Sequence, residues 1–169
     1  MSNSLRDKVV VVTGASSGIG RSIVLESASR GATVILMARH QDKLEEIANE
    51  ARQLSGNDVF VFPTDISKAD QIDRAFNEII SHVDHIDYLV NAAGFGVFKE
   101  FLETSPQVVT EMFQTNVLGL MYFTRLVARV MIDQKAGQII NFGSIAGIVP
   151  TTKTAAYSAT KACLLYTSP

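Results

Sequence analysis

The chain has 169 residues, of which 47% are hydrophobic and 19% are charged, and this balance excludes a disordered or collagen-like protein. Fifteen basic and seventeen acidic side chains give a net charge of −2, which argues against binding to nucleic acid through a basic surface. The single cysteine excludes a disulfide scaffold, and no apolar run reaches the ~18 residues of a membrane span. We expect one soluble, cytoplasmic domain.

Five short runs rich in β-branched and aromatic residues predict strands at 9–13, 33–37, 59–62, 88–90 and 139–142. None of them alternates apolar with polar residues, so each strand is expected to be buried on both faces. Helical patterns lie between them, at 18–29, 42–54, 68–82 and 106–134, and Gly31 stands where the first helix should end. This alternation predicts an α/β fold with a doubly wound, Rossmann-like parallel sheet.

The first predicted strand runs directly into Thr-Gly-Ala-Ser-Ser-Gly-Ile-Gly at 13–20, and a helix follows. Glycine lets the backbone turn sharply and approach a ligand, and a helix N-terminus offers unpaired N–H groups to a pyrophosphate. A glycine-rich turn that binds nothing is the alternative, which the flanking strand and helix disfavour. The expected cofactor contacts are Gly14, Ser16, Ser17, Gly18, Ile19 and Gly20.

The end of the second predicted strand bears on the choice between NAD and NADP. An acidic residue about 20 positions beyond the loop binds the ribose of NAD, whereas an arginine nearby accommodates the 2′-phosphate of NADP. Ala38 takes the acidic place and Arg39 follows it. A solvated arginine is the alternative interpretation, but the lack of a competing carboxylate favours NADP, and NAD is the less favoured cofactor.

Two polar groups later in the chain each have two interpretations. Asp65 follows the third predicted strand and either accepts a hydrogen bond from the adenine amine or caps the next helix. His82 and His85 alternate with Asp84 and Asp87, which suggests a metal site, but polar residues are ordinary at a helix end. We therefore predict no metal.

A set of candidate catalytic residues follows the fifth predicted strand, where Ser144 precedes Tyr157 and Lys161. Positions i and i+4 share one helix face, so the lysine ammonium is expected beside the phenol. A nearby positive charge favours phenolate, and Tyr157 then exchanges a proton with a substrate oxygen that Ser144 holds by a hydrogen bond. Separately, each feature has an ordinary alternative: a chance pair on a helix surface for the tyrosine and lysine, and a turn cap for the serine.

Together with Asn-Ala-Ala-Gly at 91–94 and Asn116, these motifs resemble the core branch of the short-chain dehydrogenase/reductase family over residues 8–162. The resemblance implies an NADP-dependent oxidoreductase that transfers hydride between a nicotinamide and a carbonyl or alcohol substrate. It implies a homodimer or homotetramer when the protein is full length, whereas the charge balance and the short apolar runs predict binding of neither nucleic acid nor membranes. Ala92 departs from the family, which has a second asparagine there.

The resemblance also assigns roles to residues. Asn116 bends its helix and holds a proton-relay water, which makes it catalytic with Ser144, Tyr157 and Lys161. Lys161 also binds the nicotinamide ribose. The cofactor contacts that the resemblance implies include Asn91, Ala92, Gly94, Tyr157 and Lys161, which join Arg39 and Asp65.

The last seven residues depart from the family, which continues the helix and adds two further strands. Cys-Leu-Leu-Tyr-Thr-Ser-Pro at 163–169 is encodable by DNA that resembles the end of a transposase-based sequencing adapter. We therefore expect 1–162 to be an incomplete dinucleotide-binding and catalytic domain, truncated after the fifth strand and the start of the catalytic helix. Residues 163–169 are then a non-native tail, in which Cys163 has no function.

Two questions stay open at this point. The given chain is either an enzyme fragment, which is inactive if the missing part is essential, or a truncated non-catalytic dinucleotide-binding or interaction protein. Its substrate is equally open, because ketones, sugars, acyl-carrier thioesters and steroids all fit these motifs. Phe95, Val97 and Phe98, after the fourth strand, either form an apolar substrate wall or pack as a satellite cluster.

Overall fold

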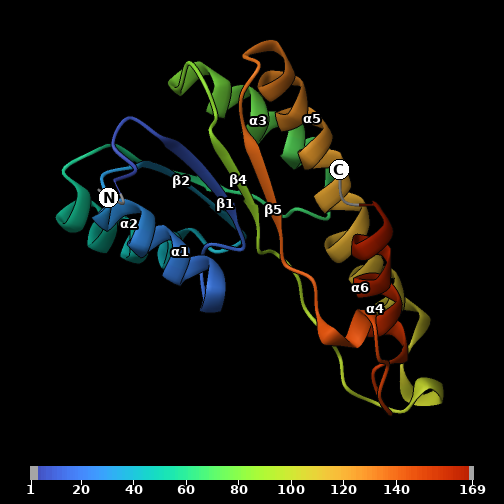
Figure 1. Ribbon diagram of the computed structural model, residues 1–169. Coiled ribbons are helices and arrows are strands. Elements are labelled where there is room, and N and C mark those ends of the chain that lie inside the picture. Colours follow the sequence, from blue (N-terminus) through green and yellow to red (C-terminus); the bar gives the residue numbers. More distant parts are fainter. Residues whose placement is uncertain (1–3, 168–169) are drawn as a thin grey trace.

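The computed structural model describes residues 4–167, in which five parallel strands form one sheet in the order β3-β2-β1-β4-β5 (Figure 1). The predicted doubly wound α/β fold is confirmed. The strands are β1 (Val9–Thr13), β2 (Thr33–Ala38), β3 (Val59–Pro63), β4 (Tyr88–Asn91) and β5 (Gln138–Asn141).

Six α-helices and three short helical segments connect or follow the strands within the described residues. The α-helices are α1 (Gly18–Ser29), α2 (Gln41–Ser55), α3 (Ala69–His82), α4 (Pro106–Phe113), α5 (Leu120–Asp133) and α6 (Ala155–Thr167). The short segments are the 3₁₀ turns η1 (Phe101–Glu103) and η3 (Ile145–Gly147) and the π-helix η2 (Gln114–Gly119).

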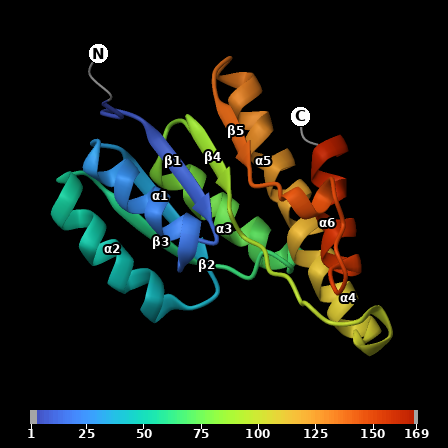
Figure 2. The ribbon, with the colours of Figure 1, turned by 60° about the horizontal axis from the view of Figure 1, so that its bottom comes forward.

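Two hydrophobic cores lie on opposite faces of the sheet, because successive side chains of a strand point to opposite sides. On β1, Val9 and Val11 belong to one core, whereas Val10 and Val12 belong to the other. Helices α3 and α5 cover the first face and α1 and α2 cover the second, as Figure 2 shows.

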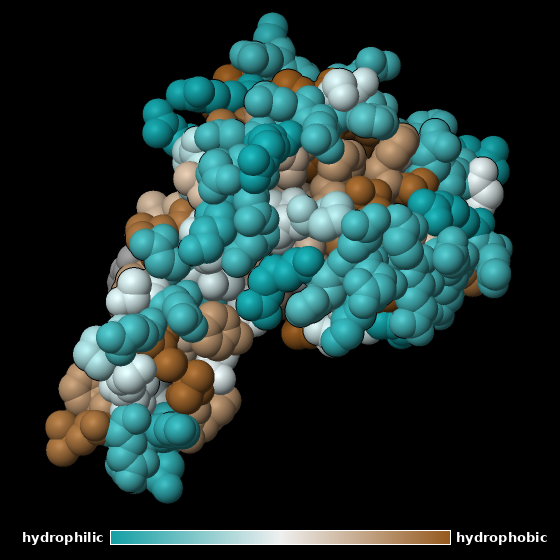
Figure 3. All heavy atoms as spheres, turned by 180° about the vertical axis from the view of Figure 1, so that it is seen from behind, coloured by the Kyte–Doolittle hydropathy of each residue, from teal (hydrophilic) through white to brown (hydrophobic). Residues whose placement is uncertain are grey.

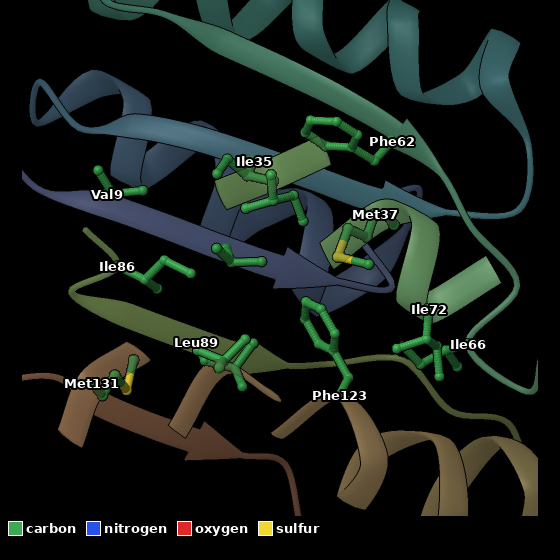
Figure 4. Packing of buried hydrophobic residues seen from close by; sticks show 14 residues of the cluster. Val9, Ile35, Met37, Phe62, Ile66, Ile72, Ile86, Leu89, Phe123 and Met131 are labelled. Atoms are coloured by element: carbon green, nitrogen blue, oxygen red, sulfur yellow. The ribbon is translucent and has the colours of Figure 1, made fainter. Parts of the chain in front are cut away.

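The core under α3 and α5 includes the largest buried side chains. Phe123 of α5 and Ile72 of α3 are inaccessible or nearly so, and they pack beside Met37 at the carboxyl end of β2 (Figure 4). Full burial of a side chain of this size contributes about 1.5–3 kcal/mol. This packing therefore fixes the strand ends from which the functional loops emerge.

The two outer strands differ from their prediction. Ile140 of β5 is 37% exposed, and Phe60 and Val61 of β3 are only partly buried, so burial of every strand on both faces is wrong. The reason is their position, because β3 and β5 are the edges of the described sheet. An apolar run alone does not reveal which strand lies at an edge.

The helix predicted at 106–134 is continuous but contains a π-helical turn at its centre, η2. Gly119 explains part of this deviation, since a Cβ atom there would lie 1.9 Å from the carbonyl oxygen of Ile66. The backbone therefore touches a neighbouring segment at this point. Gly31 confirms its predicted role: it adopts φ +86° after α1, and its N–H bonds to the carbonyl of Ala28 at 2.9 Å.

Of the residues predicted to form a non-native tail, 163–167 continue α6, and 168–169 lie outside the described residues. The origin of 163–169 stays a prediction. Within the part of the chain that the structure describes, no helix is both long and apolar enough to cross a membrane.

Candidate active site

A cleft of about 330 Å³ opens at the carboxyl ends of β1, β2 and β4. The strand order reverses between β1 and β4, which is the point where open α/β sheets bind their ligands. The cleft is lined by ten of the predicted cofactor-binding residues: Gly14, Ser16, Ser17, Gly18, Ile19, Gly20, Arg39, Asp65, Ala92 and Gly94.

The glycines of the 13–20 loop fit a site where backbone approaches a ligand. Gly14 has φ +69°, and a Cβ atom there would lie 2.6 Å from the backbone nitrogen of Ala93. Gly20 packs its α-carbon against the carbonyl of Gly14, where a Cβ would come within 2.2 Å. Gly18, with φ +51°, faces open space. The loop therefore lies close against the segment after β4 and stays open on the side of the cleft.

The N-terminus of α1 borders the cleft, since Gly18, Ile19 and Gly20 belong to its lining. Ser17 is the N-cap of α1, and its side chain makes no capping hydrogen bond. The first N–H groups of a helix have no partner within the helix, so they are available to an anion here. These observations fit a pyrophosphate-containing ligand.

The residues at the ends of β2 and β3 form the opposite side of the cleft. Arg39 is exposed at the rim, directly after β2. The carboxylate of Asp65 accepts hydrogen bonds from the Ser67 N–H at 2.9 Å and from the Ser67 hydroxyl at 2.7 Å. Asp65 thus shapes the turn that leads to α3 and also borders the cleft.

Asn91, at the end of β4, is buried and is not part of the cleft lining. Its amide nitrogen donates to the hydroxyl of Thr124 at 2.8 Å and to the side-chain oxygen of Asn141 at 2.9 Å. Its own Oδ1 has no hydrogen-bond partner within residues 4–167. The geometry thus shows Asn91 joining β4 to α5 and β5, and its predicted cofactor contact stays a prediction.

Asn116, within the π-helix, holds the loop that follows β4. Its side chain accepts from the Phe95 N–H at 3.0 Å and donates to the Phe95 carbonyl at 2.8 Å. The same amide nitrogen donates to Thr160 of α6 at 3.1 Å. The π-helix therefore connects both the loop and α6 through Asn116, and the bend and the relay water that the resemblance implies at Asn116 stay predictions.

Lys161 and Tyr157 lie on α6, as their spacing predicts. The Lys161 ammonium is 5.9 Å from the centroid of the Tyr157 ring, and it donates to the Phe142 carbonyl at 2.7 Å. Burial lowers the pKa of Lys161 from its usual value, because a low-dielectric surrounding penalises the charged form. A Cβ atom at Gly94 would lie 3.1 Å from the Asn116 oxygen and 3.9 Å from the Lys161 nitrogen. Gly94 therefore connects the cleft to the catalytic candidates.

Ser144 stands at the start of η3, where its hydroxyl accepts a hydrogen bond from the Ala146 N–H at 3.2 Å. The turn-cap interpretation of this serine is thus observed. Gly147, which ends η3, packs against the backbone of Lys161. A Cβ atom on this glycine would lie only 2.8 Å from the Lys161 carbonyl carbon. η3 consequently lies against the helix that carries Tyr157.

Sequence reasoning missed several residues that hold the site together. Thr13 accepts a hydrogen bond from the Ala93 N–H at 3.2 Å, and Thr160 accepts one from Asn116. Gly96 lies on the Tyr157 ring, where a Cβ would come within 2.9 Å of Cδ2. Thr13 and Thr160 adjoin residues that the motifs had singled out, which is the signal that would have found them. Nothing local marks Gly96.

Three comparisons place this arrangement among known proteins. A family model described as short chain dehydrogenase matches residues 8–167. An uncharacterized oxidoreductase of Staphylococcus aureus is 34% identical over 160 residues, which are 95% of this chain and 68% of that protein. The chain thus spans about two thirds of this relative's length.

Solved structures agree with the family match. A metagenomic short-chain oxidoreductase in complex with NADP has a TM-score of 0.91 at 35% identity, covering 98% of this chain and 74% of its own. A xylitol dehydrogenase bound to NAD⁺ has a TM-score of 0.91 at 26% identity, covering 96% of this chain and 62% of its own.

Proposed function

Because the chain belongs to the short-chain dehydrogenase family of NAD(P)-dependent oxidoreductases, we propose that it interconverts a carbonyl compound and an alcohol, with NADP as the preferred cofactor. One observation carries this proposal: Gly94 lies both in the lining of the cleft and against the side chains of Asn116 and Lys161. A cofactor in the cleft would therefore end beside the catalytic candidates.

The residues present fit a nicotinamide dinucleotide. The N–H groups at the start of α1 and the 13–20 loop would hold the pyrophosphate, and Arg39 would pair with the 2′-phosphate. Asp65 would accept from the adenine amine, and Lys161 from its place beside Gly94 would donate to the nicotinamide ribose. Arg39 supports NADP over NAD, because a carboxylate that would repel the phosphate is absent at position 38.

The protein's own part in the reaction is proton transfer and orientation. When bound, the reduced cofactor supplies a hydride to the carbonyl carbon. Tyr157 donates its phenolic proton to the carbonyl oxygen, so the C=O double bond becomes a C–O single bond, with a new C–H bond on the carbon and a new O–H bond on the oxygen. The Lys161 ammonium stabilises the phenolate left behind, and Ser144 donates a hydrogen bond to the substrate oxygen. Oxidation of the alcohol follows the same steps in reverse.

Assembly and location belong to the same proposal. Leu118 of η2 and Met121 of α5 are about half exposed, although each is apolar. These side chains support a homodimer or homotetramer in which η2 and α5 meet a second copy, and a cytoplasmic location is proposed with it. Size-exclusion chromatography with light scattering measures the mass directly.

The test of the proposed function combines binding with turnover. NADPH fluorescence is titrated with the chain and compared with NADH, and consumption of NADPH is then followed with a panel of ketones and aldehydes. We expect tighter binding of NADPH than of NADH and consumption that depends on an added carbonyl compound. Absence of binding by both cofactors would refute the function.

A further inference from the structure

The loop after β4 presents aromatic side chains to solvent beside the catalytic tyrosine. Phe98 is 65% exposed and Phe95 is 37% exposed, and neither belongs to the two hydrophobic cores. The alternative of a packed satellite cluster therefore does not describe these two rings. An exposed phenylalanine forgoes about 25 cal/mol for each Å² of apolar surface left in water.

Phe98 is held against Tyr157. The centroids of the two rings are 5.8 Å apart, and the rings are tilted by 51°. Both ends of the loop are anchored, since Asn116 binds the Phe95 backbone and the Lys99 N–H donates to the Lys153 carbonyl at 3.1 Å. Phe98 is thus a fixed part of the surroundings of the phenol.

A second apolar segment follows Ser144. Ile145, Ile148 and Val149 are all more than half exposed, on the segment that packs against α6 through Gly147. In Figure 3, which views the molecule from behind, brown apolar atoms gather at the lower left, on the end formed by α4, α6 and their connecting segments. We call the following side chains the apolar wall: Phe95, Phe98, Ile145, Ile148 and Val149.

The two loops beside Tyr157 also differ from the rest of the surface in their charge. Residues 94–98 and 144–152 include no Asp, Glu, Lys, Arg or His. Lys99 follows Phe98 directly and is exposed, and the next charged side chains along the two loops, Glu100 and Lys153, form an ion pair of 3.7 Å with each other. The two segments themselves therefore offer apolar surface to a substrate beside Tyr157.

We propose that the substrate is a carbonyl compound or alcohol with an extended apolar body, which packs on the apolar wall while its oxygen reaches Tyr157. This inference rests on the proposed function, because it takes Tyr157 as the group that meets the substrate oxygen. A substrate so placed lies next to Phe98, which makes Phe98 a specificity-determining residue.

The test uses a single tryptophan as a reporter, which is possible because the chain has none. Phe98→Trp keeps an aromatic ring on the wall, and its fluorescence is titrated with 2-butanone and 2-octanone in the presence of NADPH. We expect saturable binding that tightens about two- to fourfold for each added methylene group. Binding of NADPH is measured separately.

Matched variants distinguish binding of 2-octanone to the apolar wall from non-specific hydrophobic binding. Phe98→Ala should weaken 2-octanone about five- to tenfold, measured by ligand-observed NMR, and Phe98→Leu should retain most of the affinity. Leu102→Ala is the control, since Leu102 is 96% exposed on the neighbouring η1 and is not part of the wall. Its affinity for 2-octanone should be unchanged.

The outcomes distinguish this inference from the function beneath it. If NADPH binds but ketone affinity does not depend on chain length, the apolar substrate class is wrong and the proposed function stands. If NADPH does not bind, both are wrong. Self-association that Phe98→Ala abolishes, without ketone binding, would assign the wall to a second copy and overturn the inference.

Discussion

The phenol oxygen of Tyr157 is the atom on which the proposed chemistry depends. Tyr157→Phe removes only that oxygen, so the ring still packs on Gly96 and Phe98. We expect turnover to fall by about 10²- to 10⁴-fold, because a positioned acid contributes that much, while NADPH affinity stays unchanged. Steady-state kinetics and NADPH titration measure the two effects.

Tyr122 supplies the control for this experiment. Its hydroxyl donates to Asp73 at 2.6 Å and links α5 to α3. Tyr122→Phe should cost about 1 kcal/mol of stability and leave turnover unchanged. Turnover by Tyr157→Phe at the level of the Tyr122→Phe control would contradict the assigned role.

Arg39 carries the preference for NADP. Its guanidinium is exposed at the cleft rim, where Arg39→Ala should weaken NADPH about 10- to 100-fold, the value of a hydrogen bond to a charged group. NADH affinity should change little. Arg74→Ala, which breaks an exposed pair with Asp70 on α3, is the control. Equal losses for both cofactors in Arg39→Ala would show that the arginine does not recognise the phosphate.

At the level of single residues, the sequence predicted most of the residues that line the cleft, but not Asn91's place outside it or the contacts that each side chain makes. Spacing and strand context placed Gly14, Arg39 and Lys161 around one site, because these depend on local geometry. The clamp of Asn116 on the Phe95 backbone depends on contacts 21 residues apart, which no local pattern encodes. The same is true of Gly96 on the Tyr157 ring.

Among the elements, the π-helix η2 contains a close backbone contact at Gly119. A methyl group at Gly119 would lie 1.9 Å from the Ile66 carbonyl oxygen, so Gly119→Ala must displace backbone. We expect a loss of about 1–3 kcal/mol or more in the free energy of unfolding. Gly143→Ala is the control, since its Cβ would meet only Leu165 at 3.9 Å. Equal denaturation midpoints for the two variants would contradict the close contact.

Asp87 ties the beginning of β1 to β4. Its carboxylate accepts from the Lys8 ammonium and from the Val9 N–H, both at 2.9 Å, and it lies 3.1 Å from His85. Burial alone would raise the pKa of Asp87, but the bonds from Lys8 and Val9 and the charges of Lys8 and His85 outweigh it, and the pKa is lowered.

A lowered folded-state pKa sets the sign of the pH dependence. The stabilisation from Asp87 is complete above the pKa of the unfolded state, about 3.9, and is lost as the pH falls through the lower folded-state pKa. Urea denaturation should therefore show that Asp87→Asn costs about 1–3 kcal/mol at neutral pH and that the difference from the unsubstituted chain shrinks in acid. A difference that is constant down to the lowest pH would refute this account.

The bounds of the helices and strands were predicted from the sequence more accurately than their exposure and their contacts with neighbouring elements. Each predicted strand agrees with the structure to within one residue at either end, and 18–29 agrees with α1 throughout, because hydrophobic runs and glycines act locally. The half-exposed β5 and the π-helical η2 were missed. Both result from what packs beside the segment, which is a property of the whole fold.

For the molecule as a whole, the alternation of strands and helices was enough to predict the sheet, because right-handed parallel crossovers leave few arrangements. That sheet brings four separate segments of the chain, at 13–20, 37–40, 64–66 and 92–95, to one edge. The apolar wall could not be predicted in this way, since exposure beside Tyr157 emerges only when two distant loops meet on α6.

Hydrogen–deuterium exchange of the chain with and without NADPH tests whether the cleft and the Tyr157–Lys161 helix form one cofactor site. We predict that NADPH slows exchange in 14–20 and 92–95 and also at 157–161 of α6, where Lys161 lies beside Gly94. Unchanged exchange in these three segments at saturating NADPH, or protection confined to another part of the chain, would contradict a single cofactor site.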